Sequence, residues 1–223
     1  MTEQFFEVTV GDGKISALTT PADGQTAWAH FIYAPGAGSN INDGFGRYLA
    51  NRLAASGITT VRFQFPYMEA GKRRPDSPRL LESTWREVIE TVRLEVSGAS
   101  KIVAGGRSMG GRIASQVVVQ DTAVDALALF AYPLRPPGNP ERVRNGHFPN
   151  IGIPTLFCSG TRDSFGTPEE LKAAAAEVSN STVHLLEGAD HGFAVLKSTG
   201  KSREDGWSEA VDALLDWLQP LRG

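Results

Sequence analysis

Residues 101–111 read Lys-Ile-Val-Ala-Gly-Gly-Arg-Ser-Met-Gly-Gly. Within this stretch a G-x-S-x-G motif, residues 106–110, stands between a short apolar run and a helical pattern. In that setting the motif predicts a sharp strand-to-helix turn that exposes the Ser108 hydroxyl as a nucleophile. Its glycines fit because a Cβ two residues before or after the serine would collide with neighbouring chain. The turn also directs the Met109 N–H, at the predicted start of a helix, toward developing negative charge.

Two further motifs supply the partners of a nucleophilic serine: a base to take its proton and an acid to orient that base. Gly160-Thr161-Arg162-Asp163 and Asp190-His191-Gly192-Phe193 each follow an apolar, strand-like run. Each lies downstream of Ser108 at the end of a predicted strand, with the acid before the base, so Asp163 and His191 are the expected partners of Ser108. The three residues form a candidate Ser-Asp-His triad.

Each triad member also has a purely structural explanation. Ser108 fits an ordinary turn, and Asp163 fits an Asx-turn or the cap of a helix predicted to begin near residue 169. Asp190 is an alternative acid because it adjoins His191 in the chain. Neighbouring side chains in an extended loop point apart, however, which favours Asp163 as the partner of the histidine.

Four histidines compete for the role of base. His30 and His184 lie inside strand-like runs, where a place in the core or on a sheet face is expected. His147 lies in a proline-rich loop and is the reserve candidate. His191 is preferred because it lies in the loop after the last predicted strand, from which a catalytic base can reach the serine.

A second donor to a reacting oxyanion is predicted in Ala34-Pro35-Gly36-Ala37-Gly38, which follows the third predicted strand. The Ala37 N–H is the candidate. The same glycines also resemble the start of a dinucleotide-binding motif. Ile41 replaces its third glycine, however, and no acidic residue for a ribose follows the next strand, so this alternative is disfavoured.

Strand-like runs alternate with helical patterns along the chain, which predicts an α/β fold with mostly parallel strands and crossover helices. Besides the run before Ser108, strands are expected at 5–10, 14–18, 28–34, 59–65, 126–131, 154–159 and 182–186. Besides the helix from the serine to about residue 120, helices are expected at 43–55, 81–96, 169–178 and 207–218. The segment 132–153 is rich in proline and too short for a helical cap. An open site without a cap domain is predicted.

Composition sets the broad class. The chain has 223 residues, enough for one domain spanning 1–223. A single cysteine, Cys158, excludes an internal disulfide and leaves too few thiols for a cysteine-based zinc site. The net charge of −3 argues against general nucleic-acid binding, although residues 72–79 carry a local basic cluster. The N-terminus lacks the pattern of a signal peptide and no run resembles a membrane span, so a cytoplasmic protein without membrane contact is expected.

These motifs resemble those of the α/β-hydrolase superfamily, with which the order Ser108, Asp163, His191 agrees. Within it, the chain resembles a small lidless group that includes dienelactone-hydrolase-like, TEX-thirty and KANSL-three-like proteins. The matching stretches are residues 106–112, 132–138, 160–166 and 190–193. The resemblance implies an eight-stranded sheet flanked by helices, and the triad. It departs at Pro35, where the family commonly has a histidine.

The motifs together predict a serine hydrolase that cleaves a carboxylic ester or thioester of a small acyl substrate through an acyl-enzyme. The alternative is a hydrolase-fold scaffold with a vestigial triad. Arg107, Tyr132 and Phe193, which lie in or beside the matching motifs, are expected to contact substrate. No cofactor or metal is implied, and a monomer or homodimer is expected.

Three arginines near the motifs leave the charge of the substrate open. Arg107, Arg112 and Arg135 are all consistent with an acidic substrate. Arginines beside a nucleophile equally often bind backbone carbonyls and hold loops together. The sequence does not choose between these roles.

Overall fold

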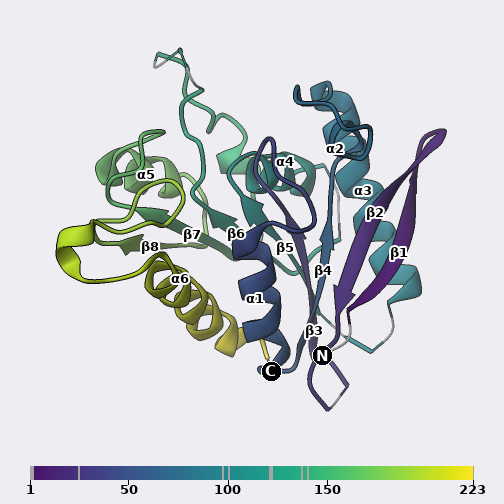
Figure 1. Ribbon diagram of the computed structural model, residues 1–223. Helices are drawn as coiled ribbons and strands as arrows, with labels where there is room; N and C mark the ends of the chain where they lie inside the picture. Colours follow the sequence, from purple (N-terminus) through teal and green to yellow (C-terminus); the bar gives the residue numbers. More distant parts are fainter. Residues whose placement is uncertain are drawn as a thin grey trace.

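The computed structural model describes residues 3–24, 26–96, 98–99, 101–120, 123–136, 138–139 and 141–222. Eight strands form one sheet in the order β1-β2-β4-β3-β5-β6-β7-β8 (Figure 1). The strands are β1 (Gln4–Val10), β2 (Gly13–Thr20), β3 (Ala29–Ala34), β4 (Ile58–Phe63), β5 (Lys101–Arg107), β6 (Ala126–Phe130), β7 (Thr155–Gly160) and β8 (Ser181–Leu186). Strands β3 to β8 are mutually parallel, whereas β2 is antiparallel to both β1 and β4.

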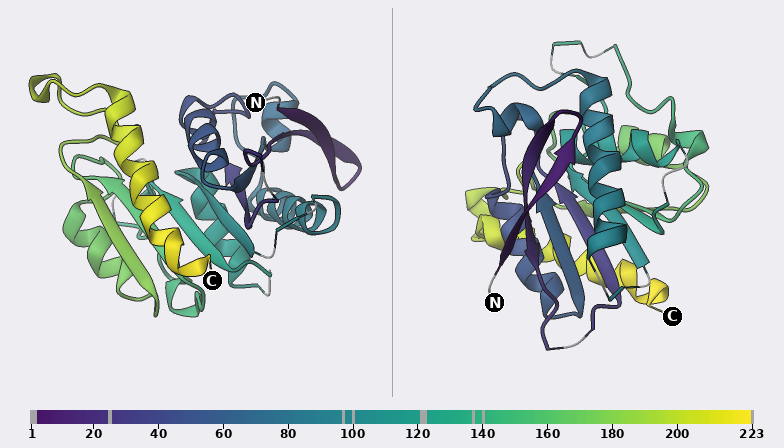
Figure 2. Two further views of the ribbon diagram at one scale, coloured as in Figure 1. Left: turned by 90° about the horizontal axis from the view of Figure 1, so that it is seen from below. Right: turned by 90° about the vertical axis from the view of Figure 1, so that its right-hand side faces the viewer.

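Helices cover both faces of this sheet. They are α1 (Gly44–Ala54), α2 (Pro66–Glu69), α3 (Pro78–Glu95), α4 (Met109–Val118), α5 (Pro168–Ala175) and α6 (Arg203–Leu218). One apolar cluster joins α3, α4 and α5 to one face, and a second joins α1 and α6 to the other. The left-hand view of Figure 2, seen from below Figure 1, shows these two layers of helices on opposite sides of the sheet. Every residue of β3, β4, β6 and β7 is buried, as expected for parallel strands covered on both faces.

The predicted α/β-hydrolase architecture is confirmed, and so are the individual strands and helices to within a few residues. A tight turn at Gly11 and Asp12 joins β1 and β2 as a hairpin, with Gly11 at a φ of 58°. The short helix α2 was not predicted. It begins at Pro66 in the first helical turn, where proline is favoured because its missing N–H is not needed there.

The described part of the proline-rich segment 132–153 contains no cap domain. Among its described residues the only helix is the 3₁₀ turn Phe148–Asn150, and Pro137 and Pro140 lie outside the described residues. This agrees with the prediction of a lidless protein. In the part of the chain that the structure describes, no helix is both long enough and apolar enough to cross a bilayer.

Candidate active site

Ser108 occupies the sharp turn between β5 and α4. Its backbone has φ 52° and ψ −118°, a strained conformation for a residue with a Cβ, and its N–H donates to the Phe130 carbonyl at 2.8 Å. A Cβ on Gly106 would lie 2.5 Å from the Ala34 carbonyl oxygen, and one on Gly110 would lie 2.2 Å from the same atom. The predicted need for both glycines is therefore confirmed.

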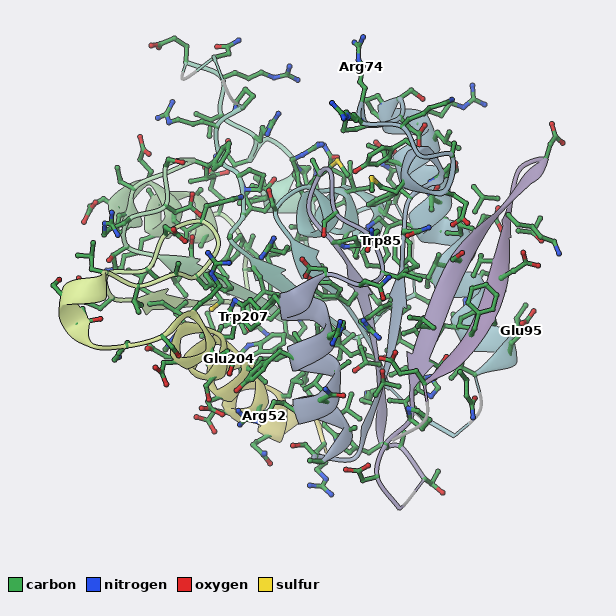
Figure 3. The ribbon with its side chains drawn as sticks, viewed as in Figure 1. Arg52, Arg74, Trp85, Glu95, Glu204 and Trp207 are labelled. Carbon is green, nitrogen blue, oxygen red and sulfur yellow. The ribbon has the colours of Figure 1, made fainter. Side chains whose placement is uncertain are left out.

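The turn is also supported from behind by Trp85 of α3. Its side chain is completely buried in the interior (Figure 3), and its Nε1–H donates to the Gly110 carbonyl at 3.1 Å. Because this bond reaches the first turn of α4, it helps to hold the helix start in place behind the serine. In the sequence, Trp85 is one apolar position within the helix expected at 81–96.

The structure brings Ser108, His191 and Asp163 together from three loops. His191 Nε2 lies 3.0 Å from Ser108 Oγ, and His191 Nδ1 lies 2.8 Å from Asp163 Oδ2. The Asp163 side chain is 2% exposed and that of His191 is 26% exposed. The Asp163 carboxylate also accepts hydrogen bonds from the Ser159 hydroxyl at 3.2 Å and the Phe165 N–H at 2.9 Å. It is thus held in one orientation toward the imidazole.

A close approach of two loops places the acid and the histidine side by side. A Cβ on Gly160, at the end of β7, would lie only 2.1 Å from the Ala189 carbonyl oxygen. The same oxygen accepts a hydrogen bond from the Arg162 N–H at 2.9 Å. The loop that carries Asp163 therefore lies against the loop that carries His191.

Asp190, the alternative acid, does not bond to the histidine ring. Its Oδ1 accepts hydrogen bonds from the Gly192 N–H at 2.8 Å and the Ala194 N–H at 2.9 Å. These bonds close the turn that follows His191. The carboxylate therefore braces the loop while Asp163 contacts the imidazole.

The two expected oxyanion donors lie beside the serine. Ala37 and Met109 line the same cavity as Ser108, and a Cβ on Gly36 would contact the Ser108 Cβ at 3.5 Å. Met109 is the first residue of α4, where N–H groups have no partner within the helix. This arrangement is compatible with donation by both N–H groups to an oxyanion.

Pro35 replaces the usual histidine in the loop after β3, but this loop is tied down in another way. The Gly38 N–H donates to the Tyr67 hydroxyl at 2.9 Å, and the Tyr67 N–H donates to Asp76 Oδ2 at 2.8 Å. Tyr67 lies on α2, the helix that the sequence did not predict. That short helix therefore supports the loop of the candidate oxyanion donor.

A cavity of about 290 Å³ opens beside Ser108. It lies between the loop after β3, the loop before α3, the start of α4 and the segments that follow β6 and β7. The lining residues are Ala37, Pro75, Asp76, Pro78, Leu81, Ser108, Met109, Arg112, Pro133, Arg144 and Phe165. A larger hollow of about 810 Å³ lies between β8 and α6, but no triad side chain lines it. The smaller cavity is therefore the candidate substrate pocket.

None of the three residues expected to contact substrate lines this pocket. The Arg107 guanidinium lies 3.5 Å from the Asp43 carboxylate. The Tyr132 hydroxyl donates to the Arg144 carbonyl at 2.6 Å, and burial raises the pKa of Tyr132 to about 12. Phe193 is completely buried in an aromatic cluster behind the site. Burial corrects the expectation for Tyr132 and Phe193, whereas substrate contact by the partly exposed Arg107 stays a prediction.

His147, the reserve base, does not line the candidate substrate pocket. Its Nε2 is 2.8 Å from Ser115 Oγ, on α4. Burial, followed by the positive charge of Arg112, lowers the pKa of His147 to about 4. The ring is therefore neutral at pH 7, and it attaches the segment after β6 to α4. It does not contact Ser108.

The described part of the chain offers neither a reactive thiol nor a cluster of metal ligands. Cys158 is completely buried in β7, and burial raises the pKa of its thiol, so it is protonated at neutral pH. Within the described part of the chain, no group of three or more histidine, cysteine, aspartate or glutamate side chains is arranged to hold a metal ion.

The sheet order, the strained serine after β5 and the loops after β7 and β8 together define an α/β hydrolase. The chain belongs to the alpha/beta hydrolase domain family, whose model matches residues 27–219. Family and fold support a hydrolase in general.

Solved structures share this fold over nearly their whole length. An alpha-beta serine hydrolase homologue from Coxiella burnetii is 22% identical, with a TM-score of 0.77 and 97% of each chain covered. A dienelactone hydrolase from Anabaena variabilis is 19% identical, with a TM-score of 0.75 and 98% of this chain and 97% of that chain covered. A serine hydrolase without a lid from Xanthomonas campestris is 15% identical, with a TM-score of 0.69 and coverages of 98% and 96%. At these identities the likeness extends to the fold and not to the substrate.

Proposed function

We propose that this protein is a serine hydrolase that cleaves a carboxylic ester or thioester of a small acyl substrate. One observation carries the proposal: the His191 ring bridges Ser108 Oγ at 3.0 Å and Asp163 Oδ2 at 2.8 Å. A hydroxyl with a base on one side and a buried carboxylate behind that base is the arrangement that activates a serine.

The reaction begins with attack of Ser108 Oγ on the substrate carbonyl while His191 Nε2 takes the hydroxyl proton. The N–H groups of Met109 and Ala37 stabilise the resulting oxyanion. The intermediate then expels the alcohol or thiol, which receives the proton from His191, and an acyl-enzyme remains. Water, deprotonated by the same imidazole, attacks the acyl-enzyme and releases the acid and free Ser108.

Asp163 selects the form of His191 that this reaction needs. Its carboxylate accepts the Nδ1–H, so the neutral ring keeps Nε2 unprotonated and ready to accept the serine proton. After the transfer, the negative charge of Asp163 stabilises the imidazolium. Since Ser159 and Phe165 also donate to this carboxylate, it does not need to reorganise during the reaction.

A fluorophosphonate probe tests the proposal because it reacts only with an activated serine. We expect stoichiometric labelling, mapped to Ser108 by mass spectrometry, together with hydrolysis of 4-nitrophenyl acetate or butyrate. The Ser108→Ala variant is the matched control and should lose both. A folded wild-type protein that takes up no probe and cleaves no ester would instead be a hydrolase-fold scaffold with an unused triad.

A further inference from the structure

Two arginines from separate elements line the candidate substrate pocket together with Ser108. Arg112 belongs to α4, and Arg144 belongs to the segment that follows β6. Both are half-buried. Neither arginine takes part in any ion pair of the described residues, and the side-chain partner of Arg112 is the neutral amide of Gln116 at 3.0 Å. The pocket therefore contains two positive charges without a described counter-ion.

Other arginines near the site are engaged elsewhere. Arg107 lies 3.5 Å from the Asp43 carboxylate, and Arg135 pairs with Glu170 at 2.6 Å. Arg74, from the basic cluster before α3, points away from the body of the protein (Figure 3). Among Arg107, Arg112 and Arg135, only Arg112 lines the pocket. Arg144 joins it there because of the fold.

The environment of these two charges favours a bound anion. Burial lowers the pKa of Arg112, and burial together with the charge of Arg112 lowers the pKa of Arg144. Both guanidinium groups nevertheless stay protonated at neutral pH. Asp76 is the one carboxylate among the described lining residues, and its Oδ2 accepts the Tyr67 N–H. Positive charge therefore exceeds negative charge in the pocket, at a place where solvent compensates it only in part.

The backbone of Arg144 is held in position. Its N–H donates to the Leu134 carbonyl at 2.8 Å, and its carbonyl accepts the Tyr132 hydroxyl at 2.6 Å. Tyr132 is itself buried against Phe148 and Phe157. A rigid base of this kind reduces the entropy that is lost when a side chain closes on a ligand.

The geometry also indicates which part of the substrate carries the anion. The leaving group must lie next to His191, which returns a proton to it, yet His191 does not line this pocket. The pocket therefore accommodates the acyl part. Arg112 follows Ser108 by four residues, about one helical turn or roughly 6 Å along α4. An acyl chain of about four to six carbons spans that distance.

We propose that Arg112 and Arg144 bind a carboxylate at the far end of the acyl group, so that the preferred substrates are monoesters or monothioesters of short dicarboxylic acids. The proposal rests on the proposed function, because it assigns the acyl group of that same reaction. Two guanidinium groups that line one pocket offer a carboxylate charge-assisted, bidentate hydrogen bonds.

A pair of substrates that differ only in charge tests this assignment. The 4-nitrophenyl monoester of adipic acid has a free carboxylate, and 4-nitrophenyl methyl adipate has an uncharged methyl ester in its place. We expect the wild-type protein to show a kcat/KM at least about tenfold higher for the charged substrate, the effect of one good charge-assisted hydrogen bond. The Ser108→Ala protein gives the blank for spontaneous hydrolysis.

Variants separate the pocket charges from the overall charge of the protein. Arg112→Gln and Arg144→Gln should each reduce the ratio of the two kcat/KM values to within about threefold of one. The matched control is Arg93→Gln, an exposed arginine paired with Glu90 on α3, and it should keep the wild-type ratio. A wild-type ratio near one, or a high ratio that survives both pocket substitutions, would overturn the proposal.

A binding measurement keeps this test distinct from the test of catalysis. Monomethyl adipate and dimethyl adipate can be titrated into the Ser108→Ala protein by calorimetry, where no turnover occurs. We expect the monoacid to bind at least about tenfold more tightly. If Ser108 takes up fluorophosphonate but neither assay distinguishes charge, the carboxylate site is wrong while the hydrolase stands. If no serine is labelled, the proposed function fails, and the titration alone decides whether the anion site exists.

Discussion

At the residue scale, two aspartates lie close to His191 and make different bonds. Asp163 arrives from the loop after β7 and contacts Nδ1, whereas Asp190 accepts two N–H groups of its own turn. Both are carboxylates within reach of the same loop. Their roles differ because only Asp163 bonds to Nδ1, the ring nitrogen that does not contact Ser108.

Replacing each aspartate by its amide tests this difference. Asp163→Asn keeps the shape but removes the charge that selects the tautomer, so we expect kcat to fall by a factor on the order of 10⁴. Asp190→Asn keeps an oxygen that accepts from the Gly192 and Ala194 N–H groups, and its loss should stay below about tenfold. The measurement is kcat with 4-nitrophenyl butyrate, with circular dichroism to verify folding. If the two losses came in the reverse order, the assignment of the acid would be wrong.

At the element scale, the site depends on how closely the ends of neighbouring strands pack. The loops after β7 and β8 touch through backbone atoms at Gly160 and Ala189, without an intervening side chain. The segment after β6 is fastened to α4 through His147 and Ser115. These two contacts determine where Asp163 and Arg144 lie relative to Ser108.

Gly160→Ala should separate the two loops. Its Cβ would meet the Ala189 carbonyl oxygen at 2.1 Å, and backbone atoms yield only if the loops move apart. We expect the free energy of unfolding to fall by about 2 kcal/mol or more, and kcat to fall with it because Asp163 moves away from His191. Gly152→Ala is the matched control, since no heavy atom lies within 4 Å of its added Cβ. Urea unfolding and esterase assays of both variants measure the effect, and equal stability of the two would contradict this account of the loop contact.

The buried His147 should make stability depend on pH. Its pKa is about 4 in the folded protein and about 6.5 when unfolded, so below pH 6.5 the unfolded state binds the proton more readily. The neutral His147 ring makes its full contribution to the free energy of unfolding above pH 6.5, and this contribution is lost as the pH falls from 6.5 toward 4. Between pH 7.5 and 5, the wild-type protein should lose about 1 kcal/mol more unfolding free energy than His147→Gln, after allowance for partial exposure.

Urea unfolding at the two pH values measures this difference. The internal control is the interval from pH 7.5 to 8.5, where His147 is neutral in both states and the two proteins should respond to pH in parallel. A His147→Gln protein with the wild-type loss between pH 7.5 and 5 would show that the histidine does not carry this dependence.

At the scale of the whole molecule, the absence of a cap domain leaves the site at an open edge of the sheet. The pocket beside Ser108 measures about 290 Å³ and is bounded by loops instead of an inserted domain. A long acyl chain would find neither an apolar tunnel nor a lid that opens at a lipid surface. The architecture therefore favours short, soluble substrates.

A series of 4-nitrophenyl esters of increasing chain length tests this consequence. We expect kcat/KM to fall by about tenfold or more between the butyrate and the dodecanoate, because methylenes beyond the pocket stay in water. Ser108→Ala serves as the blank at each length. A rate that rose sharply above the critical micelle concentration of the long ester would contradict the prediction, since it would indicate interfacial activation.

The sequence alone was sufficient for the fold and for the geometry around Ser108. The G-x-S-x-G turn and the alternation of strands and helices are local patterns, and local backbone sterics produce them wherever they occur. The requirement for Gly106 and Gly110 was predictable for that reason. The position of His191 after the last strand followed from the order of the strands, and α2 was missed because its four residues carry almost no periodic signal.

Only the tertiary structure decided which side chains share the pocket. Tyr132 and Phe193 stand in or beside the motifs but are buried, whereas Arg144, from a segment without a motif, lines the same pocket as Arg112. Distances between segments far apart in the chain depend on how the elements pack, which local sequence patterns do not encode. For that reason the sequence determined the sharp turn that carries Ser108, while the packing of the loops determined which side chains line the pocket beside it.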